Sequence, residues 1–298
     1  MVVVPEWVCT LVSWLEDIML NSYGVRLERS SLSPAGGFQG TWTVTVAVPS
    51  GETERWFLRK VFSSARWCTI AGILHALQLP TIKPIPCNET TLAYRGVFGI
   101  PLSEFRLAHC DDIVAFAEAL GDAIIPPLIT EMGDRKPANM IITRMSSEGS
   151  YRITHIDFDK SLYIPWYDKV FNRRRFTKYL VRRLVLPWVG TVHGHGFNSI
   201  FLDTVCTRAA ACLGSSLSRQ GNLKRPFSIN YFDEELRHAK TNLFLDVSVL
   251  NHVVRQMMYW RRKSPMTLRN EISRLWNSAI ITGVDQVVQS DGTDSSYT

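Results

Sequence analysis

The sequence predicts an α+β fold, in which a small β-rich part is followed by a larger, mainly helical part. Two changes of pattern along the chain support this prediction. Residues 1–22 place apolar side chains at helical spacing, residues 24–62 alternate apolar and polar side chains, and helical spacing returns from residue 111. A sheet of sequential strands with the helices grouped after it is the arrangement that such an order favours.

The N-terminal segment, residues 1–22, is predicted to form an amphipathic helix that begins at Pro5. Its apolar residues recur three and four positions apart, at Trp7, Val8, Leu11, Trp14, Leu15 and Ile18. The segment lacks a basic start and carries acidic residues at Glu6, Glu16 and Asp17. A signal peptide is therefore not the favoured interpretation.

Three antiparallel strands are expected after this helix, because alternating segments are separated by short turns rich in Gly, Pro and Ser. They lie at residues 24–32, 41–48 and 55–62. A helix and two further strands complete this part, at residues 65–78, near Ile85 and at 91–97.

The rest of the chain is predicted to be helical, apart from a strand-loop-strand stretch between residues 132 and 163. Its helices are expected at residues 167–186, 199–217, 232–240, 246–262 and 266–281. The predicted organisation is an N-terminal helix, a β-rich domain, a mainly helical domain with a helical extension and a disordered tail, at residues 1–22, 23–98, 99–285 and 286–298.

Composition excludes several classes of protein. An apolar fraction of 46% with a formal charge of +6 excludes wholesale disorder. The six cysteines have no zinc-like spacing, so reduced thiols in the cytoplasm are expected. We find no stretch of about 18 uncharged apolar residues that would suit a spanning helix, and expect at most a peripheral membrane contact.

Three polar residues in the strand-loop-strand stretch carry the predicted chemistry. Asp134 is followed five positions later by Asn139, and Asp157 stands at the end of the second strand. Phosphoryl transfer needs a carboxylate near the attacking hydroxyl, and an amide oxygen with a second carboxylate to hold magnesium. Two protein ligands suffice, because Mg²⁺ keeps water and phosphate in the rest of its shell. Asp134 is therefore the catalytic candidate, and Asn139 and Asp157 are the metal candidates.

These residues lie in motifs that resemble a known superfamily. Two motifs resemble the catalytic and metal-binding loops of the protein-kinase-like superfamily: Gly133-Asp-Arg-x-x-x-Asn139 and His155-Ile-Asp-Phe158. Their residues match most closely those of the corresponding loops in phosphoinositide kinases. Ile156-Asp-Phe-Asp-Lys160, with the Arg-rich segment after it, resembles lipopolysaccharide-core sugar kinases. The resemblance spans roughly residues 24–190. It implies a two-lobed protein-kinase-like fold in an atypical member, with a hinge at residues 94–99.

A further similarity lies in the expected linker. The linker of aminoglycoside and choline kinases is similar in its spacing of residues to Leu79-Pro-x-x-Lys-Pro84 together with residues 92–102. The resemblance implies that ATP and Mg²⁺ are the cofactors and that a hydroxyl is phosphorylated. It also implies that a glycine-rich turn and a lysine on the third strand bind the nucleotide, in the order that a kinase requires.

The nucleotide-binding candidates are Lys60 and three glycines of the first turn, Gly36, Gly37 and Gly40. Where the glycine-rich turn of kinases has its first glycine, this chain has Ala35. Lys60 shares a strand face with Leu58 and Phe62, which predicts a buried lysine that needs an anionic partner such as ATP phosphate. Arg59 lies on the opposite face and is expected to be solvated.

Two departures from the kinase pattern concern activity. Kinases pair the lysine with a glutamate of the next helix, whereas residues 63–81 contain no acidic residue. Either Glu89 or Glu104 takes its place, or Asp157 and phosphate hold Lys60 without it. Asp159 replaces the flexible glycine that usually follows the metal-binding Asp-Phe, and is either a turn cap or a third metal ligand.

A run of basic residues follows the metal-binding motif. Residues 169–183 contain seven Lys and Arg and no acid, including Arg173, Arg174 and Arg175. Such a run is either a solvated helix face or a grip for an anionic substrate. A second cluster at Arg261-Arg262-Lys263 extends it or touches an acidic membrane surface. Nucleic-acid binding is the weaker option, because the basic residues and aromatic residues do not form a recognised nucleic-acid-binding module.

The sequence is compatible with more than one class of acceptor molecule and with more than one kind of activity. The Arg-rich segment favours a sugar, a lipid or another small anionic molecule, and a protein Ser/Thr hydroxyl is the alternative. The missing helix glutamate favours a pseudokinase that binds nucleotide or a protein partner without turnover. Transfer of AMP instead of phosphate is a third alternative.

Overall fold

The structure, a computed structural model, describes residues 3–36, 40–47, 52–107, 110–131, 137–145, 149–159, 188, 198–224 and 246–281. The chain divides into two units. The first combines Met1–Phe98 with Arg219–Val254, and the second combines Gly99–Ser218 with Arg255–Thr298. Each unit is described by itself below.

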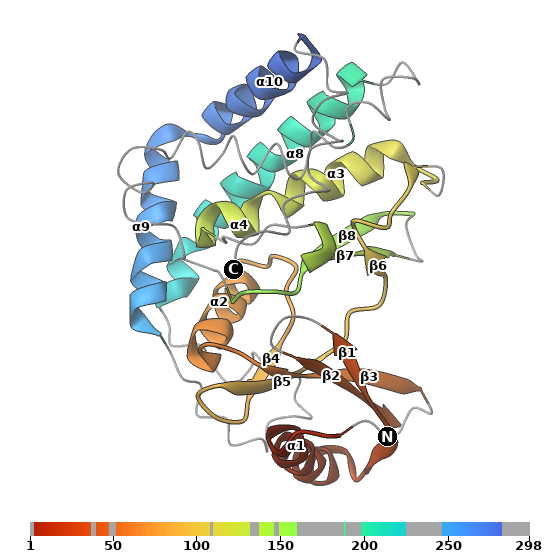
Figure 1. The fold of residues 1–298 in the computed structure, drawn as a ribbon. Coiled ribbons are helices and arrows are strands. Elements are labelled where there is room, and N and C mark those ends of the chain that lie inside the picture. Colours follow the sequence, from red (N-terminus) through yellow and green to blue (C-terminus); the bar gives the residue numbers. More distant parts are fainter. Residues whose placement is uncertain are drawn as a thin grey trace. The chain divides into compact units, whose positions relative to one another are not determined.

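The first unit is built on a five-stranded antiparallel sheet with the strand order β1-β2-β3-β5-β4 (Figure 1). Its strands are β1 (Leu27–Gly36), β2 (Thr41–Ala47), β3 (Thr53–Lys60), β4 (Pro84–Pro86) and β5 (Thr91–Arg95). The first three strands follow one another as hairpins, so the predicted antiparallel order is confirmed.

Strand β1 is longer at its C-terminal end than the alternating pattern predicts. It continues through Pro34 to Gly36, with two irregularities in its register against β2. Proline lacks the backbone N–H that a central strand would need on both sides. It is tolerated here because β1 is an edge strand of the sheet.

Helix α1 (Glu6–Tyr23) packs its apolar stripe against one face of this sheet (Figure 1). Val8, Leu11 and Leu15 are fully buried. The helix ends at Gly24, whose left-handed conformation lets its N–H donate to the Leu20 carbonyl over 3.0 Å. The apolar face that the sequence predicts for α1 is thus the face that is buried against the sheet.

Helix α2 (Ser64–Ala76) lies on the other side of the sheet (Figure 1). The Ser63 side chain caps it by accepting from the Arg66 N–H. Later residues of the chain bond to it, because Arg219 and Asn222 donate to the carbonyls of its last residues and the Asp246 N–H donates to Thr69 Oγ1 over 2.8 Å. Periodicity cannot predict this return of a distant segment to the first unit.

The second unit contains a small three-stranded sheet with the order β6-β7-β8. Its strands are β6 (Ile100–Pro101), β7 (Met140–Arg144) and β8 (Tyr151–His155). A β7–β8 hairpin is the strand-loop-strand stretch that the sequence predicts. Gly99 comes immediately before β6 with a φ of 137°, and a Cβ there would lie 2.2 Å from the Ile142 carbonyl oxygen.

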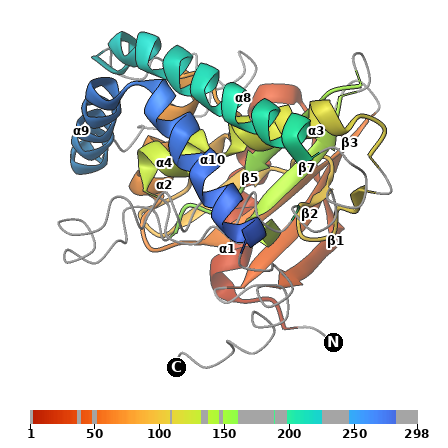
Figure 2. The ribbon, with the colours of Figure 1, turned by 90° about the horizontal axis from the view of Figure 1, so that it is seen from above.

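Helices α3 (Ile113–Ala123), α8 (Asn198–Ser218) and α10 (Pro265–Ile281) lie side by side in this unit (Figure 2). The short helix α4 (Ile125–Thr130) continues α3, and α9 (Val247–Lys263) precedes α10. Gly121 allows the close approach of α3 and α8, since a Cβ there would lie 2.8 Å from the Val205 carbonyl oxygen. The predicted helices 199–217, 246–262 and 266–281 are confirmed.

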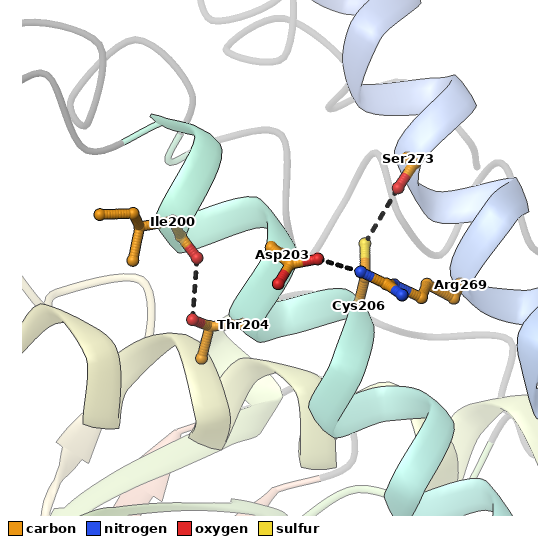
Figure 3. A network of polar contacts seen from close by, with 6 residues as sticks. All are labelled: Ile200, Asp203, Thr204, Cys206, Arg269 and Ser273. Atoms are coloured by element: carbon orange, nitrogen blue, oxygen red, sulfur yellow. Dashed lines mark hydrogen bonds and ion pairs between the residues drawn. The ribbon is translucent and has the colours of Figure 1, made fainter.

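Polar contacts join α8 to α10 across their interface (Figure 3). Arg269 on α10 donates to the carboxylate of Asp203 on α8. One turn further along α8, the Cys206 sulfur lies 3.5 Å from Ser273 Oγ. Burial raises the pKa of the Cys206 thiol, so it remains a protonated, packed side chain.

The predicted fold class is confirmed, since an antiparallel N-terminal sheet is followed by a mainly helical part. Two segments, Ile113–Thr130 and Ser199–Leu223, are long and apolar enough to span a membrane, a test that core helices of soluble proteins also pass. The predicted helices 167–186 and 232–240 and the tail 286–298 lie outside the described residues. The predicted domain boundaries and localisation stay predictions.

Candidate functional site

The β7–β8 hairpin brings Asn139 and Asp157 to the same end of two paired strands. Asn139 closes a short 3-10 turn, Pro137–Asn139, directly before β7, and Asp157 comes two residues after β8. Met140 is paired with His155, and the Ile156 N–H donates to the Asn139 carbonyl over 3.0 Å. Because the strands are antiparallel, the start of one lies beside the end of the other. Residues 18 positions apart are thereby held on neighbouring strands.

The segment after β8 is fixed by a turn and a buried ring. Asp157 Oδ1 accepts a 3.1 Å hydrogen bond from the Asp159 N–H, so part of the carboxylate stabilises the local backbone. Phe158 is fully buried, whereas Asp157 and Asp159 are half-buried. The Asp-Phe-Asp sequence therefore anchors its ring in the core and leaves two carboxylates near the surface.

His155 links the hairpin to helix α3. Its ring is buried, and its Nε2–H donates to the Ala123 carbonyl over 2.9 Å. Burial lowers the pKa of His155 to about 4, because the charged imidazolium is poorly solvated there. At neutral pH His155 is thus an uncharged link between β8 and the end of α3.

The donor set at this end of the hairpin suits magnesium. One amide oxygen and one carboxylate on adjacent strands match the few hard oxygen ligands that Mg²⁺ takes from a protein. Within the described part of the chain, no group of three or more His, Cys, Asp and Glu side chains could hold a metal ion. The role of Asn139 and Asp157 as metal ligands stays a prediction.

Other predicted site residues lie outside the described residues: Asp134, Gly37, Arg173, Arg174 and Arg175. Of the remaining glycines, Gly36 is the last residue of β1 and is paired with Thr41. Gly40 has a φ of 70°, and a Cβ there would meet nothing within 4 Å. The turn thus requires glycine at position 40 for its backbone conformation and leaves open space beside it.

The expectation that Lys60 is buried is wrong. Lys60 is exposed, although Leu58 on the same face is fully buried. The reason is its place at the end of β3, where the buried face opens; Phe62, two residues later, is 68% exposed. The nucleotide-binding role of Lys60 stays a prediction.

Arg59 also differs from its expected solvated position. It is half-buried, and its Cζ atom lies 5.0 Å from the centre of the Trp67 ring on α2. The alternating pattern defines two faces of β3 but does not indicate which of them α2 covers. The contact with Trp67 identifies the face of Arg59 as the covered one.

Glu89 and Glu104 are the two residues that could replace the missing helix glutamate. Glu89 has an exposed side chain, and its carbonyl accepts from the Ser64 N–H over 2.8 Å at the start of α2. Glu104 is exposed in the second unit. Helix α2 itself carries no Asp or Glu. Its contact to a cation of β3 is made by Trp67 instead.

Glu131 is a buried residue that sequence reasoning missed. It follows α4 directly and adopts a left-handed conformation with a φ of 47°. The Gln256 side chain on α9 donates to its Oε1 atom over 2.7 Å, and both side chains are buried. A non-glycine residue in this conformation is a signal of local strain, and it stands three residues before Asp134 in the sequence.

The second basic cluster is described by the structure. Arg261, Arg262 and Lys263 are exposed in the last turn of α9, where positive charge also suits the helix C-terminus. Its proposed role against an anionic surface stays a prediction.

Taken together, the antiparallel N-terminal sheet, the helical C-terminal part and the Asn–Asp hairpin are consistent with a kinase-like two-lobed fold. Among solved structures, the chain is similar to the Helicobacter pylori proinflammatory kinase CtkA, at 11% sequence identity and a TM-score of 0.40. The match covers 84% of this chain and 97% of that chain. No protein-family model and no curated protein matches the chain.

Proposed function

We propose that the chain is an ATP- and Mg²⁺-dependent phosphotransferase that phosphorylates a hydroxyl group. The observation that carries this proposal is the hairpin that holds Asn139 beside Asp157. An amide oxygen and a carboxylate on adjacent strand ends are the protein ligands that a nucleotide-bound magnesium ion takes in kinases. The backbone hydrogen bond from Ile156 to Asn139 fixes the register that brings them together.

The proposed roles follow from the chemistry of phosphoryl transfer. Asn139 and Asp157 hold the metal, and Asp134 orients the acceptor hydroxyl or takes its proton. Magnesium supplies neutralisation of the phosphate charge when it is bound. The chain's own contribution is positioning and electrostatic stabilisation, since no covalent step on the protein is needed.

The proposed acceptor is a sugar, a lipid headgroup or another small anionic molecule. Its support is the run of seven basic residues at 169–183, which follows the metal-binding motif in sequence. Guanidinium groups bind phosphate and carboxylate with paired hydrogen bonds. A protein Ser/Thr hydroxyl is the alternative acceptor.

The test is transfer of labelled phosphate from ATP, with Mg²⁺, to a panel of sugars, lipid headgroups and a protein. We expect turnover in the wild type, and a loss of about a hundredfold or more in Asp134→Ala and Asp157→Ala, because each removes a group that acts in the transition state. Asp17→Ala is the matched control, since Asp17 is an exposed aspartate of α1. Turnover unchanged in both site variants would exclude the assignment.

A nucleotide-binding scaffold without turnover is the second candidate. It is favoured by the absence of acidic residues from α2 and by the exposure of Lys60. Melting temperatures with ATP and Mg²⁺ separate the cases, because a ligand that binds only the folded state raises its stability. A shift without phosphate transfer identifies the scaffold, and mass spectrometry of the acceptor distinguishes transfer of AMP.

A further inference from the structure

The C-terminal half of α9 has a basic outer face. Arg255, Met258 and Arg262 follow one another three and four positions apart, so they lie on one side of the helix, and all three are exposed. Arg261 and Lys263 stand beside Arg262 and are exposed as well. Helix α9 itself carries no Asp or Glu. Four cations therefore lie within nine residues of one helix, with an apolar side chain among them.

The inner face of the same half of α9 is buried, which fixes the direction of the outer face. Met257 is fully buried and Trp260 is almost so. Gln256 on this side donates to the buried Glu131 over 2.7 Å, within the second unit. Packing thus uses the apolar side of the helix and leaves the basic side in contact with solvent.

A tight corner joins α9 to α10 directly after the basic residues (Figure 1). Ser264 alone connects the two helices, in a left-handed conformation with a φ of 66°. Its N–H donates to the Trp260 carbonyl over 3.1 Å, and its carbonyl accepts from the Thr267 N–H over 3.2 Å. Met266 in the first turn of α10 is 55% exposed, and Met258 is 47% exposed. The corner therefore presents one exposed methionine on each side of the cluster 261–263, on a backbone that is already ordered.

The charge of these two helices exceeds what helix stability requires. Residues 247–281 contain six Lys and Arg and a single acid, the half-buried Glu271. Arg269 is paired with Asp203 of α8. Cations in the last turn of α9 suit the helix C-terminus, but Arg255 lies six residues before Arg261, beyond the reach of that effect. The remaining surplus of positive charge favours a negatively charged partner.

The two methionines distinguish between anionic partners. Nucleic acids are bound through donors to phosphates and bases and through aromatic rings that stack on bases, and a thioether side chain supplies neither. A long, unbranched apolar side chain instead fits between lipid headgroups, where it displaces little and adapts its shape. Exposed apolar side chains flanked by cations are the composition of a surface that lies on an anionic membrane.

We propose that the corner between α9 and α10 binds the surface of an anionic phospholipid bilayer. Lipid phosphates and carboxylates are contacted by the four exposed cations of α9, Arg255, Arg261, Arg262 and Lys263. The side chains that enter the headgroup layer are Met258 and Met266. The inference goes beyond the proposed function and does not depend on it, because none of these residues has a role in phosphoryl transfer.

The test is co-sedimentation of the full chain with vesicles of phosphatidylcholine alone, and with vesicles in which about 30% of the lipid is phosphatidylserine. We expect binding to the anionic vesicles only, and weaker binding at high salt, because salt screens the attraction. The triple variant Arg255→Gln, Arg261→Gln and Arg262→Gln is expected to bind about a hundredfold more weakly, since each basic residue near the surface contributes about tenfold or slightly less.

The matched control removes the same charge from three exposed arginines outside α9 and α10. It carries Arg26→Gln, Arg55→Gln and Arg106→Gln. Binding to the anionic vesicles is expected to change by less than about threefold, because charges distant from the contact are screened. Melting temperatures show that both triple variants are folded.

A second variant tests the apolar contacts and leaves the charge unchanged. Met258→Ser with Met266→Ser is expected to weaken binding to the anionic vesicles by about tenfold, because two partly buried apolar side chains are lost from the headgroup layer. A surface that only attracts anions would not respond to this change.

Several outcomes would overturn the inference. Equal binding to neutral and anionic vesicles, or equal losses in the two triple variants, would reject the corner as the contact. Unchanged binding in the methionine variant would reject insertion into the headgroup layer. Tighter binding to duplex DNA than to vesicles, lost in the α9 triple variant, would identify a nucleic acid as the partner instead. None of these results bears on phosphate transfer, which is measured without vesicles.

Discussion

The backbone N–H of Ile156 donates to the carbonyl oxygen of Asn139 over 3.0 Å, so the main chain of the predicted metal ligand is a structural element of the hairpin. The side chain of Asn139 is not required for that bond. The backbone of Asn139 thus holds the hairpin together, and its side chain is the candidate metal ligand. A substitution there can remove a candidate ligand and leave the strand pairing intact.

Asn139→Ala is expected to raise the Mg²⁺ concentration for half-maximal turnover by about tenfold, because it removes one of the two proposed protein ligands. Its free energy of unfolding should change little, since the hairpin bond is made by the backbone. Asn139→Asp keeps a ligand oxygen and should retain more activity than the alanine variant. Titration of activity with Mg²⁺ and urea denaturation measure the two effects. An unchanged Mg²⁺ requirement in Asn139→Ala would contradict its assignment as a ligand.

His155 is expected to make the protein less stable in mild acid. Its pKa is about 4 in the folded state and about 6.5 in an unfolded chain, so between these values the unfolded state binds more protons. Stability from this group is complete above about pH 6.5, falls by about 1.4 kcal/mol per pH unit below it, and levels off near pH 4.

Urea denaturation at pH 7.5, 6 and 5 measures this dependence. His155→Gln can still donate to the Ala123 carbonyl and should show a flatter profile. His75→Gln is the control, because the His75 side chain is exposed on α2. A His155→Gln profile as steep as that of the wild type would show that other groups cause the acid sensitivity.

Gly121→Ala is expected to destabilise the second unit by about 1–3 kcal/mol, because the added methyl would meet the backbone of α8. Gly214→Ala is the matched control within a helix. Its Cβ would lie 3.7 Å from Pro265 Cγ, which is ordinary contact, so the better helix propensity of alanine should stabilise by up to about 1 kcal/mol. Opposite signs in thermal unfolding are the expected result. Equal effects would mean that α3 and α8 can separate without cost.

Gly99→Ala is expected to be more harmful than Gly24→Ala. Both glycines have positive φ, but the Cβ at Gly99 would lie 2.2 Å from the Ile142 carbonyl oxygen, whereas that at Gly24 meets nothing within 4 Å. Gly24→Ala should cost about 1–2 kcal/mol from its backbone conformation alone. Gly99→Ala adds a clash in the β6–β7 pairing and should cost more than about 3 kcal/mol. Similar losses of melting temperature in the two variants would show that β6 moves freely from β7.

The elements of the fold could be predicted because their patterns are local. The stripe of α1, the alternation in β2 and β3 and the turns between them are each set by neighbouring residues. The placement of Asn139 and Asp157 at the same end of the hairpin could also be predicted, since both residues belong to one strand-loop-strand stretch. Here the order of residues in the chain and their proximity in space coincide.

Other features depend on contacts that periodicity cannot express. Alternation separates Arg59 from Lys60 but does not say which face α2 covers, so the buried and exposed residues were exchanged in the prediction. Gln256 meets Glu131 from 125 positions away. A buried pair of this kind is determined by tertiary packing, and its only local signal is an acidic residue at the end of an apolar helix.

The packing of α1 on the sheet has a practical consequence for handling the protein. Val3, before the helix, is 86% exposed, so a substitution there leaves the packing of α1 intact. Removal of α1 would instead expose the apolar sheet face around Val44 and Leu58, both fully buried in the intact chain. Versions of the protein that lack α1 would therefore tend to aggregate, and soluble expression requires the helix to be retained.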